Sequence, residues 1–190
     1  MSFDLAGALR ALKPQKHTRL LAPGRESGLD WASDQPINGY PLLLDTCVYI
    51  DMLRDTAPEF LDRLLERRIC HHSAVCLAEL THAFGRLDPS RPETALVLRK
   101  IGEVIQNIKR HRLHEPDSGI WGQAGIVAGE LSRRSGLPKT PGSSKKYLND
   151  ALIALQAKKL GANVLTANVR DFDYLSQIIP GARVLYYKSA

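Results

Sequence analysis

The 190-residue sequence has no long apolar run and only three cysteines. No window approaches the roughly 18 uncharged apolar residues that a membrane-spanning helix needs, so we expect no transmembrane segment. The first residues include Asp4 and no extended apolar stretch, which argues against a secretory signal. The odd number of cysteines forms no paired framework and favours a reducing compartment. These absences predict a soluble cytoplasmic protein without a membrane partner.

Internal repeats and low-complexity tracts are absent too, whereas positive charge is plentiful. With 26 Lys and Arg against 20 Asp and Glu, the formal net charge is +6 and the pI is about 9.3. A basic balance favours polyanionic partners such as nucleic acid, although a solvated basic surface would give the same numbers. The apolar fraction of 44% is enough for a sizeable core.

Residues 1–40 differ in composition from the rest of the chain. Phe3, Leu5, Leu9 and Leu12 predict a short amphipathic helix, and prolines and glycines that break regular structure follow it. The charged residues between positions 10 and 25 are all positive: Arg10, Lys13, Lys16, Arg19 and Arg25. We interpret residues 1–40 as a partly irregular N-terminal extension that wraps the core or meets a partner, with a disordered tail as the alternative.

From residue 41 onward, short apolar segments alternate with helical patterns. Strands are expected at 42–44, 69–74, 112–115, 163–166 and 183–187. Helices are expected at 47–53, from Pro58, at 75–84 with a stop at Gly85, from Pro92 to 108, and at 118–134, 146–160 and 172–178, with the tract KTPGSSKK as a loop. This alternation predicts an α/β fold, in which a parallel sheet carries helices on both faces.

Four acidic residues stand at positions where such a sheet collects its ligands. Asp45 ends the apolar run LLL, and Asp171 follows the expected strand NVLT after a short turn. Glu79 and Asp150 lie on apolar faces of expected helices, an unusual setting for a charge. Ligands bind beyond the carboxyl ends of parallel strands, so these four side chains are expected to converge.

Converging carboxylates repel one another, and some would take up a proton unless a cation lay between them. Hard cations such as Mg²⁺ and Mn²⁺ prefer oxygen ligands. The pattern therefore predicts a divalent-metal site rather than an acid–base pair.

The segments LLLDTCVYID, AVCLAELTHAFG and YLNDALIALQAKKLGANVLTANVRDFDYL, in this order, resemble the PIN-domain nucleases. Within that family they are most similar to the VapC-like toxins of type II toxin–antitoxin pairs. The resemblance covers about residues 41 to 187. It implies a three-layer α/β/α PIN-like domain over residues 41–190, with a five-stranded parallel sheet. It also implies a Mg²⁺- or Mn²⁺-dependent endoribonuclease, commonly a homodimer, that a small antitoxin restrains.

By position, the family's acidic cluster falls on Asp45, Glu79, Asp150 and Asp171. Our hypothesis makes Asp45 and Asp150 the principal metal ligands, with Glu79 and Asp171 completing the shell directly or through water. The supporting polar residues of the family match Thr46, Thr166 and Asn168 here. Cys47 departs from the Ser or Asn that the family more often has, which puts a polar role at this position in doubt.

Basic residues beside the acidic positions are the candidates for RNA contacts. The main candidates are Lys145, Lys146 and Arg170, and weaker ones are Arg133, Arg134 and Lys139. A housekeeping RNA-processing nuclease and a non-catalytic RNA- or protein-binding module remain alternatives to a toxin. A haloacid-dehalogenase-like enzyme is disfavoured, because that family has Asp-x-Asp where this chain has Cys47.

Several smaller hypotheses complete the sequence-based interpretation. A zinc site is disfavoured, because the Cys and His residues between positions 70 and 82 fit no four-ligand spacing. Cys47 has no evident base that would make it a nucleophile. Asp173 is an alternative to Asp171, and Asp51 is expected to face solvent. Trp31 and Trp121 are expected to pack rather than to stack on bases.

Overall fold

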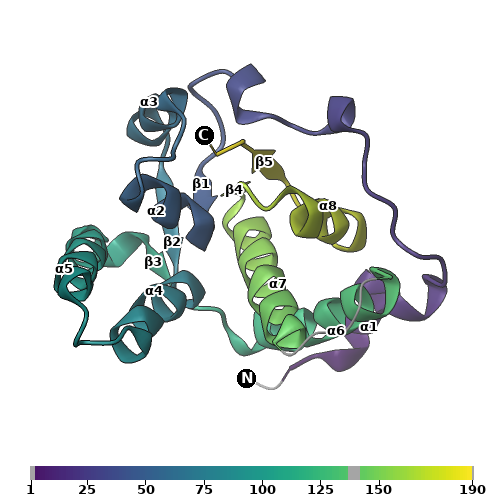
Figure 1. Ribbon diagram of the computed structural model, residues 1–190. Helices are drawn as coiled ribbons and strands as arrows, with labels where there is room; N and C mark the ends of the chain where they lie inside the picture. Colours follow the sequence, from purple (N-terminus) through teal and green to yellow (C-terminus); the bar gives the residue numbers. More distant parts are fainter. Residues whose placement is uncertain (1–2, 137–141, 190) are drawn as a thin grey trace.

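The molecule is a five-stranded sheet between two layers of helices, as Figure 1 shows for a computed structural model that describes residues 3–136 and 142–189. The strands are β1 (Leu42–Leu44), β2 (Cys70–Ser73), β3 (Leu113–His114), β4 (Asn163–Thr166) and β5 (Val184–Tyr186). The α-helices are α1 (Leu5–Leu12), α2 (Thr46–Leu53), α3 (Glu59–Arg67), α4 (Ala74–Arg86), α5 (Pro92–Asn107), α6 (Ser118–Arg134), α7 (Ser143–Leu160) and α8 (Val169–Ile178). All strand pairs are parallel, so the α/β fold with a five-stranded parallel sheet is confirmed.

The order of the strands, β3-β2-β1-β4-β5, determines where a ligand site can form. The chain leaves β1 on one side to build β2 and β3, then returns to the other side of β1 to build β4 and β5. Right-handed crossovers then place the helices of the two halves on opposite faces, with α2 to α5 on one side and α6 to α8 on the other in Figure 1. Because the order reverses beside β1, the ligand crevice is expected at the carboxyl ends of β1 and β4.

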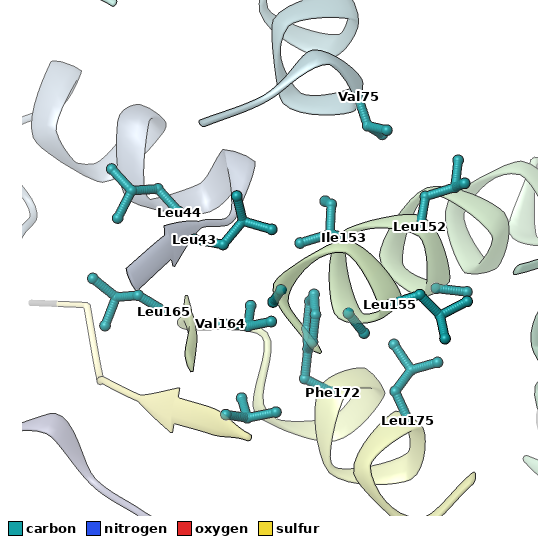
Figure 2. Close-up of a cluster of buried hydrophobic side chains, with 14 of the residues drawn as sticks. Leu43, Leu44, Val75, Leu152, Ile153, Leu155, Val164, Leu165, Phe172 and Leu175 are labelled. Atoms are coloured by element: carbon teal, nitrogen blue, oxygen red, sulfur yellow. The ribbon is translucent and has the colours of Figure 1, made fainter. Parts of the chain in front are cut away.

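The core is built around β1, β4 and α7. Leu42 and Leu43 of β1 and Leu165 of β4 have no exposed surface, as expected for central strands covered on both faces. Figure 2 shows Ile153 of α7 and Phe172 of α8 in the same cluster of apolar side chains. This packing holds α7 against the sheet, and α7 carries Asp150.

Several helix boundaries differ from the expected ones, and α8 begins at Val169, three residues before the expected start at 172. Helix α4 runs through Gly85 to Arg86, because Gly85 does not adopt the left-handed backbone that ends a helix and the chain becomes extended only at Leu87. Helix α7 begins at Ser143, so the end of the expected KTPGSSKK loop is helical. Gly142, with φ of 88°, is the residue that redirects the chain into this helix.

Residues 3–40 lie on the core rather than apart from it. Helix α1 packs on α6, and the following segment crosses α8 to reach β5 (Figure 1). The amide of Gly24 donates to Asp173 Oδ2 at 2.7 Å, and Trp31 forms a parallel bridge with Tyr186. The end of the extension is bound by Arg68, whose Nε donates to the carbonyl of Ile37 at 2.9 Å. The extension therefore wraps the core, whereas the division of the chain at residue 40 stays a prediction.

Candidate functional site

Asp45 lies directly after β1 and begins α2 as its N-terminal cap. Its Oδ1 accepts a hydrogen bond from the amide of Thr46 at 2.8 Å. Its Oδ2 accepts from Thr166 Oγ1 at 2.7 Å and from Cys47 Sγ at 3.0 Å. Burial raises the pKa of Asp45 in spite of these hydrogen bonds, and the nearby charge of Glu79 adds to the rise. Asp45 is thus both a helix cap and a buried carboxyl at the end of the central strand.

Asp150 reaches the same end of the sheet from α7, and only 7% of it is exposed. Burial raises its pKa well above the usual value, and the charges of Asp45, Asp171 and Glu79 raise it further. Asn168, at the start of α8, directs its Nδ2 toward Asp150 Oδ2 at 3.4 Å. The charged form of Asp150 is therefore costly unless a cation lies close to it.

Asp171 lies in the first turn of α8 and forms ion pairs with Lys146 and Arg170. The Arg170 Nε lies 3.3 Å from Asp171 Oδ1, and Asn168 Nδ2 donates to Asp171 Oδ2 at 3.2 Å. Burial alone would raise the pKa of Asp171, but Lys146, Asn168 and Arg170 together lower it. Asp171 therefore has positive neighbours, and Asn168 links it to Asp150.

Glu79 projects from α4 and is half-buried. Its Oε2 accepts a hydrogen bond from Thr46 Oγ1, and its Oε1 accepts from Asn149 Nδ2 at 2.6 Å. Sequence reasoning missed Asn149, although its place directly before Asp150 in α7 was the available signal. Asn149 and Thr46 together fix the orientation of the Glu79 carboxylate.

The four acidic residues thus come from four elements and interact electrostatically at the carboxyl end of the sheet. Their oxygen donors and the raised pKa of Asp45 and Asp150 suit a hard divalent cation. Within residues 3–136 and 142–189, however, no three Asp, Glu, His or Cys side chains are grouped closely enough to hold a metal ion. The residues fit a divalent cation by donor type and by charge, whereas their spacing in this structure does not form a ready ligand group.

Among the basic candidates, Lys146 and Arg170 lie at the acidic cluster, and Lys145 lines the hollow beside it. Arg133 and Arg134 instead donate to backbone carbonyls of the extension, so their side chains bind protein. Lys139 lies outside the described residues.

Three smaller expectations have a structural outcome. Asp51 does not face solvent freely, because its Oδ2 accepts hydrogen bonds from Tyr187 Oη at 2.7 Å and from Ser189 Oγ at 2.6 Å. Asp173 accepts a hydrogen bond from the Gly24 amide of the extension, so it does not take the place of Asp171 in the acidic cluster. Cys47 is a protonated thiol, since burial and the charge of Asp45 raise its pKa to about 12.

The two tryptophans differ from each other. Trp31 packs on Tyr186, as expected, and its Nε1 donates to the carbonyl of Glu26 at 3.0 Å. Trp121 does not pack in this way, since 48% of it is exposed.

Two hollows adjoin the acidic cluster and share Thr46, Ile50, Glu79 and His82 in their walls. One, of about 760 Å³, extends between α2, α4 and α5. The other, of about 620 Å³, extends between α4 and the N-terminal ends of α6 and α7. Glu79 is therefore accessible from both sides.

None of the helices that the structure describes is both long enough and apolar enough to cross a membrane.

Several solved structures share this fold, among them structures from Rickettsia felis and Neisseria gonorrhoeae. VapBC2 from Rickettsia felis, crystallised with a DNA fragment from its promoter, is 17% identical with a TM-score of 0.54, over 77% of this chain and 98% of that chain. FitAcB from Neisseria gonorrhoeae is 21% identical with a TM-score of 0.54, over 76% of this chain and 96% of that chain. At these identities the likeness concerns the fold. No curated protein matches the sequence.

The family itself follows from a direct match of the sequence. Residues 42–176 match the family model described as the PIN domain. The match begins at β1, after the extension, and includes the four acidic positions from Asp45 to Asp171. The order of motifs in the sequence predicted this outcome. Because the matched range spans more than half of its length, the chain belongs to the PIN domain family.

Proposed function

We propose that the protein is a metal-dependent endoribonuclease that hydrolyses RNA phosphodiester bonds and acts as the toxin of a toxin–antitoxin pair. The observation that carries this proposal is the convergence of Asp45, Glu79, Asp150 and Asp171 at the carboxyl end of a PIN-domain sheet. A non-catalytic module would not need four acidic side chains at one site, where their mutual repulsion opposes folding.

Asp45 and Asp150 would hold the cation directly, and Glu79 and Asp171 would bind it directly or through water. Mg²⁺ or Mn²⁺ suits these oxygen donors, and when bound it neutralises charge on the phosphate and lowers the pKa of a water nucleophile. Thr166 and Thr46 would hold Asp45 in place through the hydrogen bonds described above.

The remaining side chains would bind and orient the substrate. Lys145, Lys146 and Arg170 would contact phosphates of the RNA backbone, since Lys and Arg are the usual partners of phosphate. Glu79, which both hollows reach and which Asn149 orients, is placed to accept a proton from the attacking water. Asn168 would hold Asp171 and Asp150 at a fixed separation.

The toxin role rests on the motif resemblance and on the names of solved proteins with a similar fold. Two of these solved structures are named VapBC2 and FitAcB. We accordingly propose a small antitoxin as partner, a homodimer as the assembly and the cytoplasm as the location.

The decisive experiment is cleavage of labelled single-stranded and structured RNA by the purified, partner-free chain in Mn²⁺, Mg²⁺ or EDTA. RNA cleavage by the wild type is expected with either metal and is expected to be absent in EDTA. Asp45→Ala should cleave no RNA under any of these conditions. Asp62→Ala, which removes an exposed carboxyl from α3, is the matched control and should cut like the wild type.

If a folded wild-type chain cuts no RNA with any metal, the ribonuclease proposal is wrong and a binding module becomes the better interpretation. The toxin role has its own test, which is growth arrest on induction in a bacterial host. Arrest by the wild type but not by Asp45→Ala is expected. Efficient RNA cleavage without arrest would instead favour a housekeeping nuclease.

A further inference from the structure

Trp121 is a large apolar side chain in an exposed position beside the acidic cluster. It lies in the first turn of α6, and 48% of it is exposed. Within residues 3–136 and 142–189 its ring has no aromatic partner and its Nε1 has no hydrogen bond, unlike Trp31. Its indole is therefore free to contact a ligand.

The surroundings of Trp121 indicate what kind of ligand this is. Trp121 lines the hollow of about 620 Å³ together with Lys145, Lys146 and Asn149, and Glu79 lies in the same walls. Ligand sites generally occupy ~300–1,000 Å³, so this hollow can hold a small ring system with its substituents. One continuous hollow thus contains an exposed aromatic face, two amines and an acidic residue of the candidate active site.

This combination fits a single-stranded nucleic acid better than an apolar peptide. Bases stack on aromatic side chains through their flat faces, while lysine amines bind the phosphates that connect them. A base inside a duplex has both faces covered by its neighbours, so only an unpaired nucleotide can stack on the indole. An apolar peptide would offer no anionic group to Lys145, whereas Lys146 already pairs with Asp171.

We propose that Trp121 is a base-stacking residue for an unpaired nucleotide of the substrate. Lys145 and Lys146 bind the backbone of this nucleotide, and the adjoining phosphodiester lies at Asp45 and Glu79. The inference rests on the proposed ribonuclease function and deepens it, because it makes a single-stranded RNA segment the substrate class of this site.

Cleavage kinetics on a short single-stranded RNA test this assignment. Trp121→Ala is expected to raise KM by about 5- to 150-fold, the equivalent of ~1–3 kcal/mol of stacking per base. Trp121→Phe, which keeps an aromatic face, should stay within a few-fold of wild type. The melting temperature should not change for either variant, because the side chain is half exposed and outside the core.

Abasic scanning of the RNA separates stacking from a general effect on the protein. For the wild type, an abasic site at one position of the RNA should raise KM about as much as Trp121→Ala does with the intact RNA. For Trp121→Ala, the same abasic RNA should raise KM no further. If every abasic RNA raises KM equally for the variant and for the wild type, Trp121 does not stack on a base and the inference is wrong.

Fluorescence distinguishes a failure of this inference from a failure of the proposed function. In a Trp31→Phe chain Trp121 is the sole tryptophan, and single-stranded RNA should quench its emission. Quenching without cleavage would overturn the proposed catalysis and retain the stacking site. Cleavage with neither quenching nor a KM effect would overturn the stacking site alone. If Trp121→Ala changes only self-association or the binding of a protein partner, the surface around Trp121 binds protein and the inference is wrong.

Discussion

Asp150 is a buried carboxyl whose charged form is opposed both by burial and by three acidic neighbours. Because its pKa is raised in the folded state, the folded chain holds this proton more tightly than the unfolded chain does. The free energy of unfolding should therefore fall as the pH rises from ~3.9, the unfolded value, toward the raised pKa. At neutral pH without metal, Asp150 works against folding.

Asp150→Asn is accordingly expected to stabilise the metal-free protein. The variant removes the charge, so its melting temperature in EDTA should exceed that of the wild type, by ~2–4 °C for each kcal/mol gained in a chain of this size. Mn²⁺ should raise the melting temperature of the wild type and have little effect on the variant. Thermal melts in EDTA and in Mn²⁺ measure both effects. A variant that is less stable in EDTA and responds to Mn²⁺ like the wild type would contradict the role of Asp150.

Asn149 gives a second prediction at the scale of single residues. Asn149→Ala removes the 2.6 Å hydrogen bond to Glu79 and leaves that carboxylate oriented by Thr46 alone. Losing such an orienting partner generally costs about 10–100-fold in metal affinity or activity. Cleavage measured against Mn²⁺ concentration should show this loss. Asn107→Ala, at an exposed amide that ends α5, is the control, and equal losses in both variants would exclude a specific role for Asn149.

At the scale of elements, the neighbouring strands β2 and β3 carry three half-buried histidines. His72 of β2 hydrogen-bonds the Tyr49 hydroxyl through Nδ1 at 2.7 Å, and His71 lies 2.9 Å from His114 of β3. Burial, together with the nearby charges of His71, His114 and Arg112, lowers the pKa of His72 to about 4. The pKa values of His71 and His114 are lowered as well. The folded state therefore favours neutral imidazoles along β2 and β3.

The pH dependence that follows has a definite sign. Because the pKa of His72 is lowered on folding, its contribution to stability is complete above ~6.5, the unfolded value, and is lost as the pH falls toward 4. His72→Gln, which retains a hydrogen-bonding group but does not titrate, should weaken this loss. Urea melts between pH 7 and pH 4 are the measurement. His111→Gln, at an exposed position just before β3, should follow the wild type, and a His72→Gln curve parallel to it would refute the prediction.

The elements also show what the sequence could predict and what it could not. The expected bounds of β1, β4 and α6 agree with the structure, because apolar runs and a strong Asp117 cap mark them in the local sequence. Gly85 did not end α4, since a glycine stops a helix only where the backbone turns left-handed. The partners of Asp51 and Asn149 were missed because they lie far away along the chain, at Tyr187 and Glu79. Local patterns thus located the acidic positions, while tertiary packing determined which neighbours hold them.

At the scale of the whole molecule, the extension acts as a brace on one side of the core. Its Leu21 amide donates to the carbonyl of Arg134 at the end of α6, and its Gly24 amide donates to Asp173 of α8. Farther along, the amide of Tyr186 in β5 donates to the carbonyl of Asp30. The described residues that line the two hollows all lie beyond the extension, between positions 46 and 149. The brace therefore connects α6, α8 and β5 without taking part in the candidate site.

Two adjacent leucines of the extension test this separation of stability from activity. Leu21 is 7% exposed and packs in the core, whereas Leu20 is 68% exposed. Leu21→Ala should lower the free energy of unfolding by ~2–5 kcal/mol, the usual cost of removing a buried leucine side chain. Leu20→Ala should melt like the wild type.

RNA cleavage measured well below the melting transition should be nearly the same for both variants, because neither leucine approaches the acidic cluster. Equal melting temperatures would mean that residues 3–40 are bound too weakly to brace the core. A selective loss of cleavage in folded Leu21→Ala would mean that the extension positions α6 and α7, and with them Trp121 and Asp150, for the reaction. Only the combination of lower stability with unchanged cleavage agrees with a brace that lies outside the site.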